Sequence, residues 1–304
     1  MIHISHISKS YGKVIALKDI SLNIDKNELF GLIGPDGAGK TTLFRILTTL
    51  LVPDKGLAEV AGYDTVKSYK KIRTLIGYMP GKFSLYQDLS VEENLSFFAS
   101  VFGTSINENY DLIKDIYRHI EPFRKRRAGN LSGGMKQKLA LSCALIHKPE
   151  VLILDEPTTG VDAVSRKEFW EMLGNLRSKG ITIVVSTPYM DEAMRCDRIA
   201  LIQKGEILGI DTPKNIIGAF GHKMLAVRSN DMYKLMNDLR NYVNTRSVHL
   251  FGQYLHYTQK DNSPDMKEFE NFLKEKGHLG IQIDFCEPTI EDCFIELMVN
   301  EREH

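Results

Sequence analysis

The stretch Gly31–Ile46, GLIGPDGAGKTTLFRI, has residue types and a spacing that can hold phosphate groups. Its middle part fits the pattern of Gly, four residues, Gly, Lys and then Ser or Thr. Glycines allow successive backbone N–H groups to turn inward around phosphate oxygens. Lys40 adds a positive charge, and the Thr41 hydroxyl can bind Mg²⁺. We therefore predict a phosphate-binding loop made of Gly34, Pro35, Asp36, Gly37, Ala38, Gly39, Lys40, Thr41 and Thr42.

Two acidic residues follow the apolar run Val151–Leu154. Asp155 ends a predicted hydrophobic strand, where its carboxylate can hold Mg²⁺ through water. Glu156 stands beside it and can polarise an attacking water molecule. Adjacent acids after an apolar strand are seldom core residues, because burying them without partners is costly. We predict that Asp155 binds Mg²⁺ together with Thr41 and that Glu156 is the catalytic residue.

A second glycine turn, Ser132, Gly133 and Gly134, opens the amphipathic stretch that runs to Pro149. Backbone N–H groups at such a helix start can bind an anion. Capping of the helix by Ser132 is the alternative explanation. Asp155 and Glu156, which follow further along the chain, are typical of a site that handles phosphate and Mg²⁺, so they favour anion binding at this turn.

The elements that must position these groups are predicted from hydrophobic patterning. Residues 29–33 indicate a buried strand, and residues 41–51 indicate a helix whose N-terminal dipole faces the phosphates. The apolar runs 151–156 and 180–187 are typical of strands inside a parallel sheet, and the helical stretch 163–180 separates them. We expect a nucleotide-binding α/β core.

Two further blocks precede and interrupt that core. Short β-like runs surround the phosphate loop within residues 1–79. Between about residues 82 and 147 the pattern is helical, and Ser90 followed by Glu93 predicts a capped helix start. The first block predicts an antiparallel β subdomain, and the second predicts a helical subdomain.

Composition limits the kinds of partner. The chain has 304 residues, of which 43% are hydrophobic and 26% charged, with a formal net charge of zero. This predicts a globular core, with room for one large and one small domain, and gives no general electrostatic reason to expect nucleic acid. No apolar run approaches the roughly 18 residues needed to span a bilayer, and the N-terminal residues lack the apolar core of a signal peptide. We expect a cytosolic chain that can dock on a membrane protein.

Cysteine and histidine spacing predicts no structural metal. The four cysteines form no CxxC pair, so free thiols are expected. They are Cys143, Cys196, Cys286 and Cys293.

At this point the chain resembles the ATP-binding subunit of an ABC transporter over roughly residues 1–220. The motifs occur in the family's order: GPDGAGKTT as Walker A, LSGGM as the signature, VLILDE as Walker B, and GVD, ending at Asp162, as the D-loop. The resemblance implies ATP and Mg²⁺ as cofactors. It implies that Tyr11 stacks on adenine, and a tyrosine that only belongs to a hairpin is the alternative.

The same resemblance implies partners. In that family two ATP-binding domains face each other head to tail, with ATP between the Walker A loop of one and the signature turn of the other, here Ser132–Gly134. Integral-membrane permease subunits then move with the closing dimer, so the chain would lie on the cytoplasmic face of the membrane. The second domain could be another copy or a different ATPase. Met135 after the signature glycines indicates the drug and small-molecule exporter branch.

Residues 221–304 predict a separate small domain. The runs 223–229, 247–252, 254–259 and 281–287 indicate strands, and 231–243 and 263–277 indicate helices, in the order βαββαβ of a ferredoxin-like unit. A terminal helix at 289–301 follows, and its stretch EPTIEDCFIELM is similar to the end of drug-exporter ATPases. We expect an α+β accessory domain for dimer contact or regulation, or an extension without a separate role.

Two positions depart from the family pattern. Gly81 stands where the family has a Gln that senses Mg²⁺ and water, and Pro188 stands where it has a His that contacts the γ-phosphate. Neither substitute has a side-chain donor. Slower hydrolysis at this chain's own site is expected, although Gly81 also suits a loop, and Pro188 suits a helix start capped by Thr187.

Two other functions are consistent with parts of this pattern. One is a nucleotide-gated regulatory or binding module of a non-transport ABC protein. Such proteins usually carry two ATPase halves or a long coiled coil, whereas this sequence has one Walker set and no sustained heptad run. The other is a P-loop kinase, which would leave the signature turn unexplained.

Overall fold

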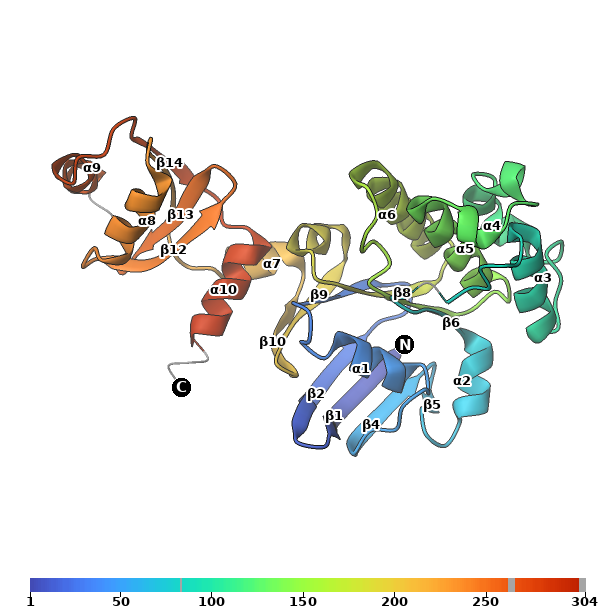
Figure 1. Cartoon of the computed structure of the whole chain (residues 1–304). Helices are drawn as coiled ribbons and strands as arrows, with labels where there is room; N and C mark the ends of the chain where they lie inside the picture. Colours follow the sequence, from blue (N-terminus) through green and yellow to red (C-terminus); the bar gives the residue numbers. More distant parts are fainter. Residues whose placement is uncertain (83, 262–265, 301–304) are drawn as a thin grey trace. The chain divides into compact units, whose positions relative to one another are not determined.

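The computed structural model describes residues 1–82, 84–261 and 266–300. The chain divides into two compact units, Met1–Lys214 and Asn215–Asn300. The predicted boundary at residue 220 lies a few residues beyond this division. Figure 1 shows the elements of each unit, which are described separately below.

A mixed sheet forms the centre of the first unit. Within the described residues it has six strands in the order β10-β9-β3-β8-β7-β6, and all neighbours are parallel except β9 and β10. The strands are β3 (Leu29–Ile33), β6 (Ile76–Met79), β7 (Val151–Asp155), β8 (Thr182–Thr187), β9 (Arg198–Gln203) and β10 (Glu206–Asp211). Every residue of β3, β7 and β8 is buried, which explains their continuous apolar runs. The predicted parallel core is confirmed.

A second sheet is antiparallel and lies across helix α1 (Lys40–Leu47) from the first. Its strand order is β2-β1-β4-β5. The strands are β1 (Ile2–Tyr11), β2 (Val14–Ile24), β4 (Lys55–Val60) and β5 (Tyr63–Asp64). The buried side chains of α1 pack with residues of both sheets, such as Ile4 and Leu32, in one core. Helix α1 is therefore held between two sheets.

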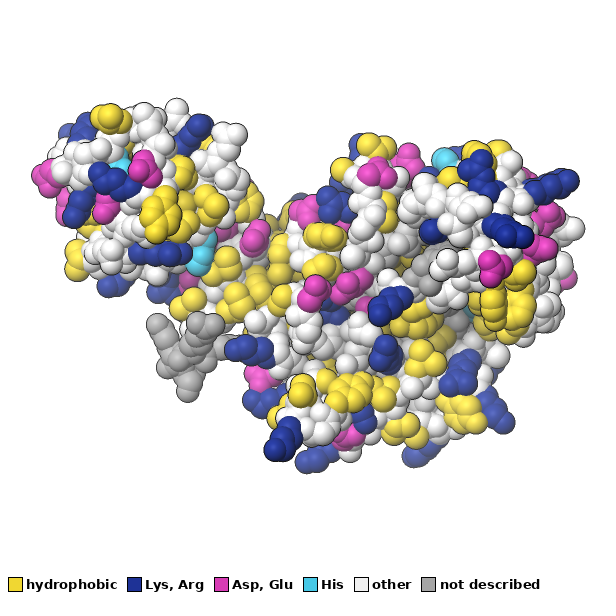
Figure 2. Space-filling model, viewed as in Figure 1, with side chains coloured by type: hydrophobic (Ala, Val, Ile, Leu, Met, Phe, Trp, Pro, Cys, Tyr) yellow, Lys and Arg dark blue, Asp and Glu magenta, His cyan; other side chains and the backbone are white. Residues whose placement is uncertain are grey.

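Helices cover the other face of the central sheet (Figure 1). They are α3 (Val91–Val101), α4 (Tyr110–Tyr117), α5 (Gly133–Leu145) and α6 (Ala163–Ser178), with α2 (Tyr69–Leu75) beside β6. Short 3₁₀ turns lie at Glu121–Phe123 and Ala128–Asn130. The capping box that begins α3 is confirmed, because Glu93 N donates to Ser90 Oγ (3.2 Å) and Ser90 N donates to Glu93 Oε2 (2.7 Å). On the face visible in Figure 2, acidic and basic side chains both occur on this unit, in keeping with the zero net charge.

The second unit is a four-stranded antiparallel sheet in the order β12-β13-β11-β14, counted over its described residues. Its elements are β11 (Met224–Arg228), α8 (Met232–Arg240), β12 (Thr245–Phe251), β13 (Tyr254–Gln259), α9 (Met266–Glu275), β14 (Gln282–Cys286) and α10 (Ile290–Asn300), after α7 (Pro213–Gly218). The order βαββαβ agrees with the prediction, although residues 263–265 and 301 of the predicted helices lie outside the described residues. Helices α8 and α9 pack on one face around Tyr257 and Phe269, whose rings stack at 4.8 Å.

The helix expected directly after Thr187 is wrong in place and type. The chain bends at Pro188, and a 3₁₀ helix begins only at Met190 and runs to Arg195, with Tyr189 as its N-cap. Thr187 Oγ1 does accept a hydrogen bond from Tyr189 N (3.1 Å), but it also donates to the carboxylate of Glu192. The Thr187 hydroxyl is therefore held by Glu192, five residues further along the chain, and no α-helix starts at Pro188.

Candidate functional site

The phosphate loop joins β3 to α1, and its glycines are required by the backbone. Gly37 and Gly39 have φ values of 79° and 110°, which disfavour residues with a side chain. A Cβ at Gly39 would lie 2.5 Å from the carbonyl oxygen of Ala16, and a Cβ at Gly34 would lie 2.1 Å from that of Ile202. The loop is thus pressed against the neighbouring strands, with the N-terminus of α1 behind it.

Lys40 is the first residue of α1, and its side chain is only 3% exposed. Its Nζ donates to the carbonyl oxygens of Gly34 (2.7 Å) and Pro35 (3.0 Å) and lies 3.1 Å from Glu156 Oε1. The predicted phosphate-binding lysine and the predicted catalytic carboxylate therefore meet in one place, although they are 116 positions apart in the sequence.

The two acids lie at the carboxyl end of β7. Asp155 is buried, and its Oδ1 accepts a hydrogen bond from Ser186 Oγ (2.6 Å). The backbone N–H of Glu156 donates to Ser186, both to its Oγ (3.0 Å) and to its carbonyl oxygen (3.1 Å). Glu156 has φ 49°, a left-handed conformation that is uncommon for a residue with a side chain. Such strained residues cluster at functional sites, where the surrounding structure must hold them.

The signature turn and the D-loop form a second group. Ser132 is the N-cap of α5 and accepts from Met135 N (3.4 Å), so capping and an exposed turn coexist here. A Cβ at Gly134 would lie 2.7 Å from Ser165 Oγ, which places the turn against the first turn of α6. Asp162 caps that helix, and hydrogen bonds from Ser165 lower the pKa of its carboxyl group. This group lies on the helical side of the central sheet, whereas α1 lies on the other side (Figure 1).

The remaining predicted residues fall at different places. Tyr11 ends β1 in the β1–β2 hairpin and is 46% exposed. The adjacent strand β2 carries Ala16, which lies close to Gly39 of the phosphate loop. Gly81 lies against the acids, because a Cβ there would be 3.1 Å from the carbonyl oxygen of Asp155. Pro188 follows directly on β8. The two departures from the family pattern therefore follow β6 and β8, the strands on either side of β7.

Two polar side chains near the acids, Thr158 and Glu192, had not been predicted. Thr158 and Thr187 both donate to the buried carboxylate of Glu192, at 2.8 and 2.5 Å. Thr187 was predicted only as a helix cap. Position at the carboxyl end of a parallel strand is the one sequence feature that pointed to Thr187 and its neighbour Ser186.

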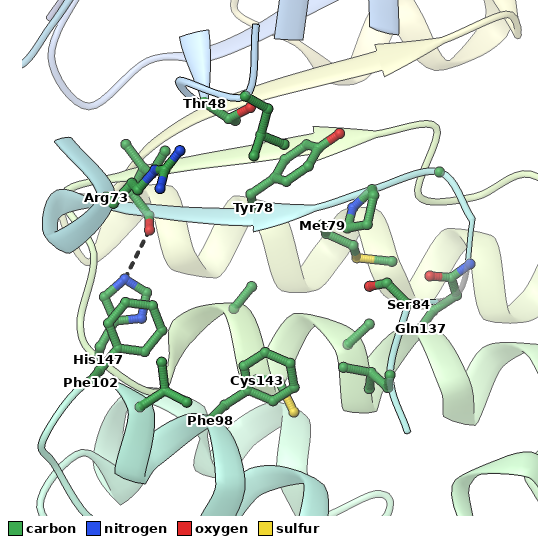
Figure 3. Close-up of a pocket in the computed structure, with 18 of the residues that line it drawn as sticks. Thr48, Arg73, Tyr78, Met79, Ser84, Phe98, Phe102, Gln137, Cys143 and His147 are labelled. Atoms are coloured by element: carbon green, nitrogen blue, oxygen red, sulfur yellow. Dashed lines mark hydrogen bonds between the residues drawn. The ribbon is translucent and has the colours of Figure 1, made fainter. Parts of the chain in front are cut away.

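An apolar groove adjoins this site. It has a volume of about 440 Å³ and reaches from Gly81 and Glu156 to the ends of α3 and α5. Figure 3 shows it between β6, which carries Tyr78 and Met79, and the segments that carry Phe98, Cys143 and His147. Burial and the nearby Asp155 carboxylate raise the pKa of Tyr78 to about 12.

His147 closes one end of the groove. Its Nε2 donates to the carbonyl oxygen of Ile76 (2.9 Å, dashed in Figure 3), and its ring stacks on Phe102 at 3.8 Å. Burial lowers the pKa of His147 below its ordinary value, although the Ile76 carbonyl acts in the opposite direction. The groove wall is thus uncharged near neutral pH at this point.

These features define a P-loop ATPase: a phosphate loop lies between the buried strand β3 and helix α1, and its lysine contacts one of two adjacent acids at the end of β7, a parallel strand of the same sheet. The sequence profile described as ABC transporter matches residues 17–159. The "Nod factor export ATP-binding protein I" of Rhizobium sp. (strain N33) is 33% identical over 306 residues, which cover 99% of this chain and 98% of that protein. The chain belongs to the family of ABC transporter ATP-binding proteins.

Two further comparisons agree with this assignment. The "Probable multidrug ABC transporter ATP-binding protein YbhF" of Escherichia coli (strain K12) is 37% identical over 298 residues, covering 93% of this chain but only 49% of that protein. The chain thus spans about half the length of this relative. A solved structure described as the "dimeric structure of a post-hydrolysis state of the ATP-binding cassette MJ0796 bound to ADP and Pi" has a TM-score of 0.63 and 27% identity, and it covers 70% of this chain and 98% of its own.

Proposed function

We propose that this chain binds MgATP in the loop Gly34–Thr42 and hydrolyses it to power an exporter in the membrane. The observation that carries the proposal is the 3.1 Å approach of Lys40 Nζ to Glu156, which brings the phosphate loop and the acidic pair together. In this arrangement Lys40 and the loop N–H groups hold the phosphates, Glu156 orients and polarises the attacking water, and Tyr11 faces the base.

The residues present suit a magnesium ion. The Thr41 hydroxyl and the Asp155 carboxylate offer the oxygen ligands that Mg²⁺ prefers, and Ser186 fixes one oxygen of that carboxylate. When bound, Mg²⁺ neutralises charge that develops on the phosphate oxygens. The protein's part is to hold Asp155 at the end of β7 so that it faces the phosphate side of the site.

A second ATP-binding domain completes the site. Ser132 and Gly133 are exposed at the start of α5, and their backbone N–H groups suit the γ-phosphate of a nucleotide held by a facing domain. The similar cassette that is described as dimeric supports such pairing. Asp162 lies beside the signature turn, where it would contact the same partner. The facing domain is either another copy of this chain or a different ATPase, and both would meet the same turn.

The groove beside the site suits a permease. Its walls are mainly apolar or aromatic, and it opens between the core and the helical layer next to Gly81 and Glu156. A helix of a membrane subunit packed there would be displaced when Glu156 and the segment that carries it move. No helix in the described part of the chain is long and apolar enough to cross a bilayer, so on this proposal the permease provides the attachment to the cytoplasmic face of the membrane. The relatives named for multidrug and Nod factor export support the exporter role.

Co-purification tests this proposal. A tagged chain, extracted in mild detergent from the cells that produce it, is expected to bring down an integral-membrane protein of several spans. The change Phe98→Asp, which places a charge in the groove, should release that protein without lowering the chain's ATP affinity. Recovery of the chain without any membrane protein would contradict the exporter role and favour a non-transport ABC module.

Hydrolysis at this chain's own site is proposed to be slow. Gly81 has no side chain and Pro188 has no donor, so two polar groups that align water in the family are replaced. Lys40, Thr41, Asp155 and Glu156 remain, so the loss is partial. Ser132–Gly134 can still complete the site of a partner with a full set of groups.

The double change Gly81→Gln with Pro188→His should raise ATP turnover at least several-fold, because one positioned polar group contributes on the order of 10²–10⁴-fold in rate. Position 81 is tight: a Cβ there lies 3.1 Å from the Asp155 carbonyl, so the loop must give by a few tenths of an ångström. Steady-state phosphate release by the purified complex is the measurement. A wild-type rate typical of enzymes, unchanged by the double substitution, would refute this account of the two positions.

A further inference from the structure

Glu192 is a buried carboxylate close to the candidate site. It lies in the 3₁₀ helix Met190–Arg195 and is 3% exposed. Thr158 Oγ1 donates to both of its oxygens (2.8 and 3.1 Å), and Thr187 Oγ1 donates to Oε2 (2.5 Å). The guanidinium of Arg166 approaches Oε1 at 3.9 Å. Burying a carboxylate is costly unless such partners compensate, so this arrangement is a specific one.

The partners of Glu192 belong to three segments that carry the chemistry. Thr158 is two residues after Glu156 in the loop that follows β7. Thr187 ends β8, and its carbonyl oxygen accepts from the N–H of Gly34, the first residue of the phosphate loop (3.3 Å). Arg166 lies in the first turn of α6, directly after the D-loop residue Asp162. One carboxylate therefore links the loop of the catalytic base, the strand end that contacts the phosphate loop, and the helix behind the D-loop.

We propose that Glu192 is a positioning residue for ATP hydrolysis. It holds the loop of Glu156 at a fixed distance from the phosphate loop through its hydrogen bonds to Thr158 and Thr187. Glu156 needs such restraint because its φ of 49° is unfavourable for a residue with a side chain. The restraint matters more in this chain, where Pro188 supplies no donor from the loop after β8. The inference rests on the ATPase activity proposed above.

The test weakens the hydrogen bond between Thr158 and Glu192 from each side in turn. Thr158→Val keeps the shape but loses the hydroxyl, and Glu192→Gln keeps the size but loses the charge. Both should lower kcat by on the order of 10- to 100-fold, the effect of a small misplacement of a catalytic group, while the Kd for ATP is unchanged. Thr158→Ser retains the hydroxyl and should restore kcat to near the wild-type value.

Glu28→Gln is the matched control. Glu28 is similarly buried (6% exposed), pairs with Arg198 at 3.3 Å and accepts from Asp25 N at 2.7 Å, but it precedes β3, at the end of the sheet opposite the acids. This control should retain kcat even if it unfolds more readily. Wild-type kcat in Thr158→Val and Glu192→Gln would overturn the inference.

Two other outcomes would also overturn it. One is an equal loss in Thr158→Ser and Thr158→Val, since the hydroxyl would then be irrelevant. The other is an equal loss in Glu28→Gln, since the effect would then be general destabilisation. If Glu192→Gln fails to fold, the comparison of kcat between Thr158→Val and Thr158→Ser tests the inference by itself. A wild-type complex without any ATP turnover would contradict the proposed function itself, which separates that failure from a failure of the Glu192 inference alone.

Discussion

Glu156→Gln is expected to bind ATP as tightly as the wild-type chain but to hydrolyse it about 10²–10⁴ times more slowly. The amide has nearly the shape of the carboxylate, but it is a poor proton acceptor and orients water less well. Its loss of charge also removes the ion pair with Lys40 at 3.1 Å. ATP should therefore remain bound, and if the chain pairs with a second ATP-binding domain, as proposed above, the pair should stay closed. Single-turnover phosphate release and the ATP Kd, measured on the same preparation, give the two quantities.

The matched control is Glu168→Gln. Glu168 also pairs with a lysine, with Lys138 Nζ at 2.8 Å, but it lies on α6 away from the phosphate loop. Its substitution should leave both the rate and the affinity near the wild-type values. Wild-type turnover in Glu156→Gln would remove Glu156 from the chemistry.

Lys40→Ala is expected to abolish most ATP binding and, with it, turnover. A charge-assisted contact of this kind is worth about 1.5–3 kcal/mol, which corresponds to roughly a 10- to 100-fold loss of affinity. The change also leaves the carbonyl oxygens of Gly34 and Pro35 and the Glu156 carboxylate without their cation. Isothermal titration with ATP, together with a thermal unfolding curve, distinguishes lost binding from lost folding.

Lys9→Ala serves as the comparison for Lys40→Ala. Lys9 has a little-exposed side chain (15%) and pairs with Asp54 at 2.6 Å, but it lies on β1. Loss of that ion pair should leave ATP affinity intact. If Lys40→Ala binds and hydrolyses ATP as the wild-type chain does, the assignment of the loop as the phosphate site is wrong.

The local features of this protein could be predicted because neighbouring residues determine them. Gly34 and Gly39 face the backbone of other strands at distances that exclude a side chain. The spacing of glycines in the sequence therefore predicts the loop directly. The capping box of Ser90 and Glu93 closes within four residues, and the apolar runs of β7 and β8 follow from burial on both faces. These features predicted the parallel core and the glycine loop between β3 and α1.

Contacts between distant residues could not be predicted in the same way. The bond from Thr158 to Glu192 joins residues 34 apart, and that from Ser186 to Asp155 joins residues 31 apart. Both depend on the parallel register of β7 and β8, which aligns Asp155 with Ser186. The expected helix at Thr187 failed for a local reason, because the Thr187 hydroxyl is engaged by Glu192, five residues further along the chain. Helix α1, predicted to residue 51, ends at Leu47, where Thr48 Oγ1 bonds back to the Phe44 carbonyl at 2.8 Å and Thr49 turns to φ 62°.

On this account ATP is hydrolysed at sites shared between two ATP-binding domains, each made of the phosphate loop of one domain and the signature turn of the other, so that Ser132 of this chain completes the site of the facing domain. Ser132 lies at the start of α5, on the face of the central sheet opposite α1, so a site made within this chain alone would not need it. The most direct measurement is therefore the ATP turnover and ATP Kd of Ser132→Arg, in the complex as it is purified from cells. We predict that turnover at the facing site falls at least 100-fold, as expected when a group is displaced from the reacting phosphate, while the Kd of this chain's own phosphate loop is unchanged. Turnover equal to that of the wild-type complex would contradict the shared site.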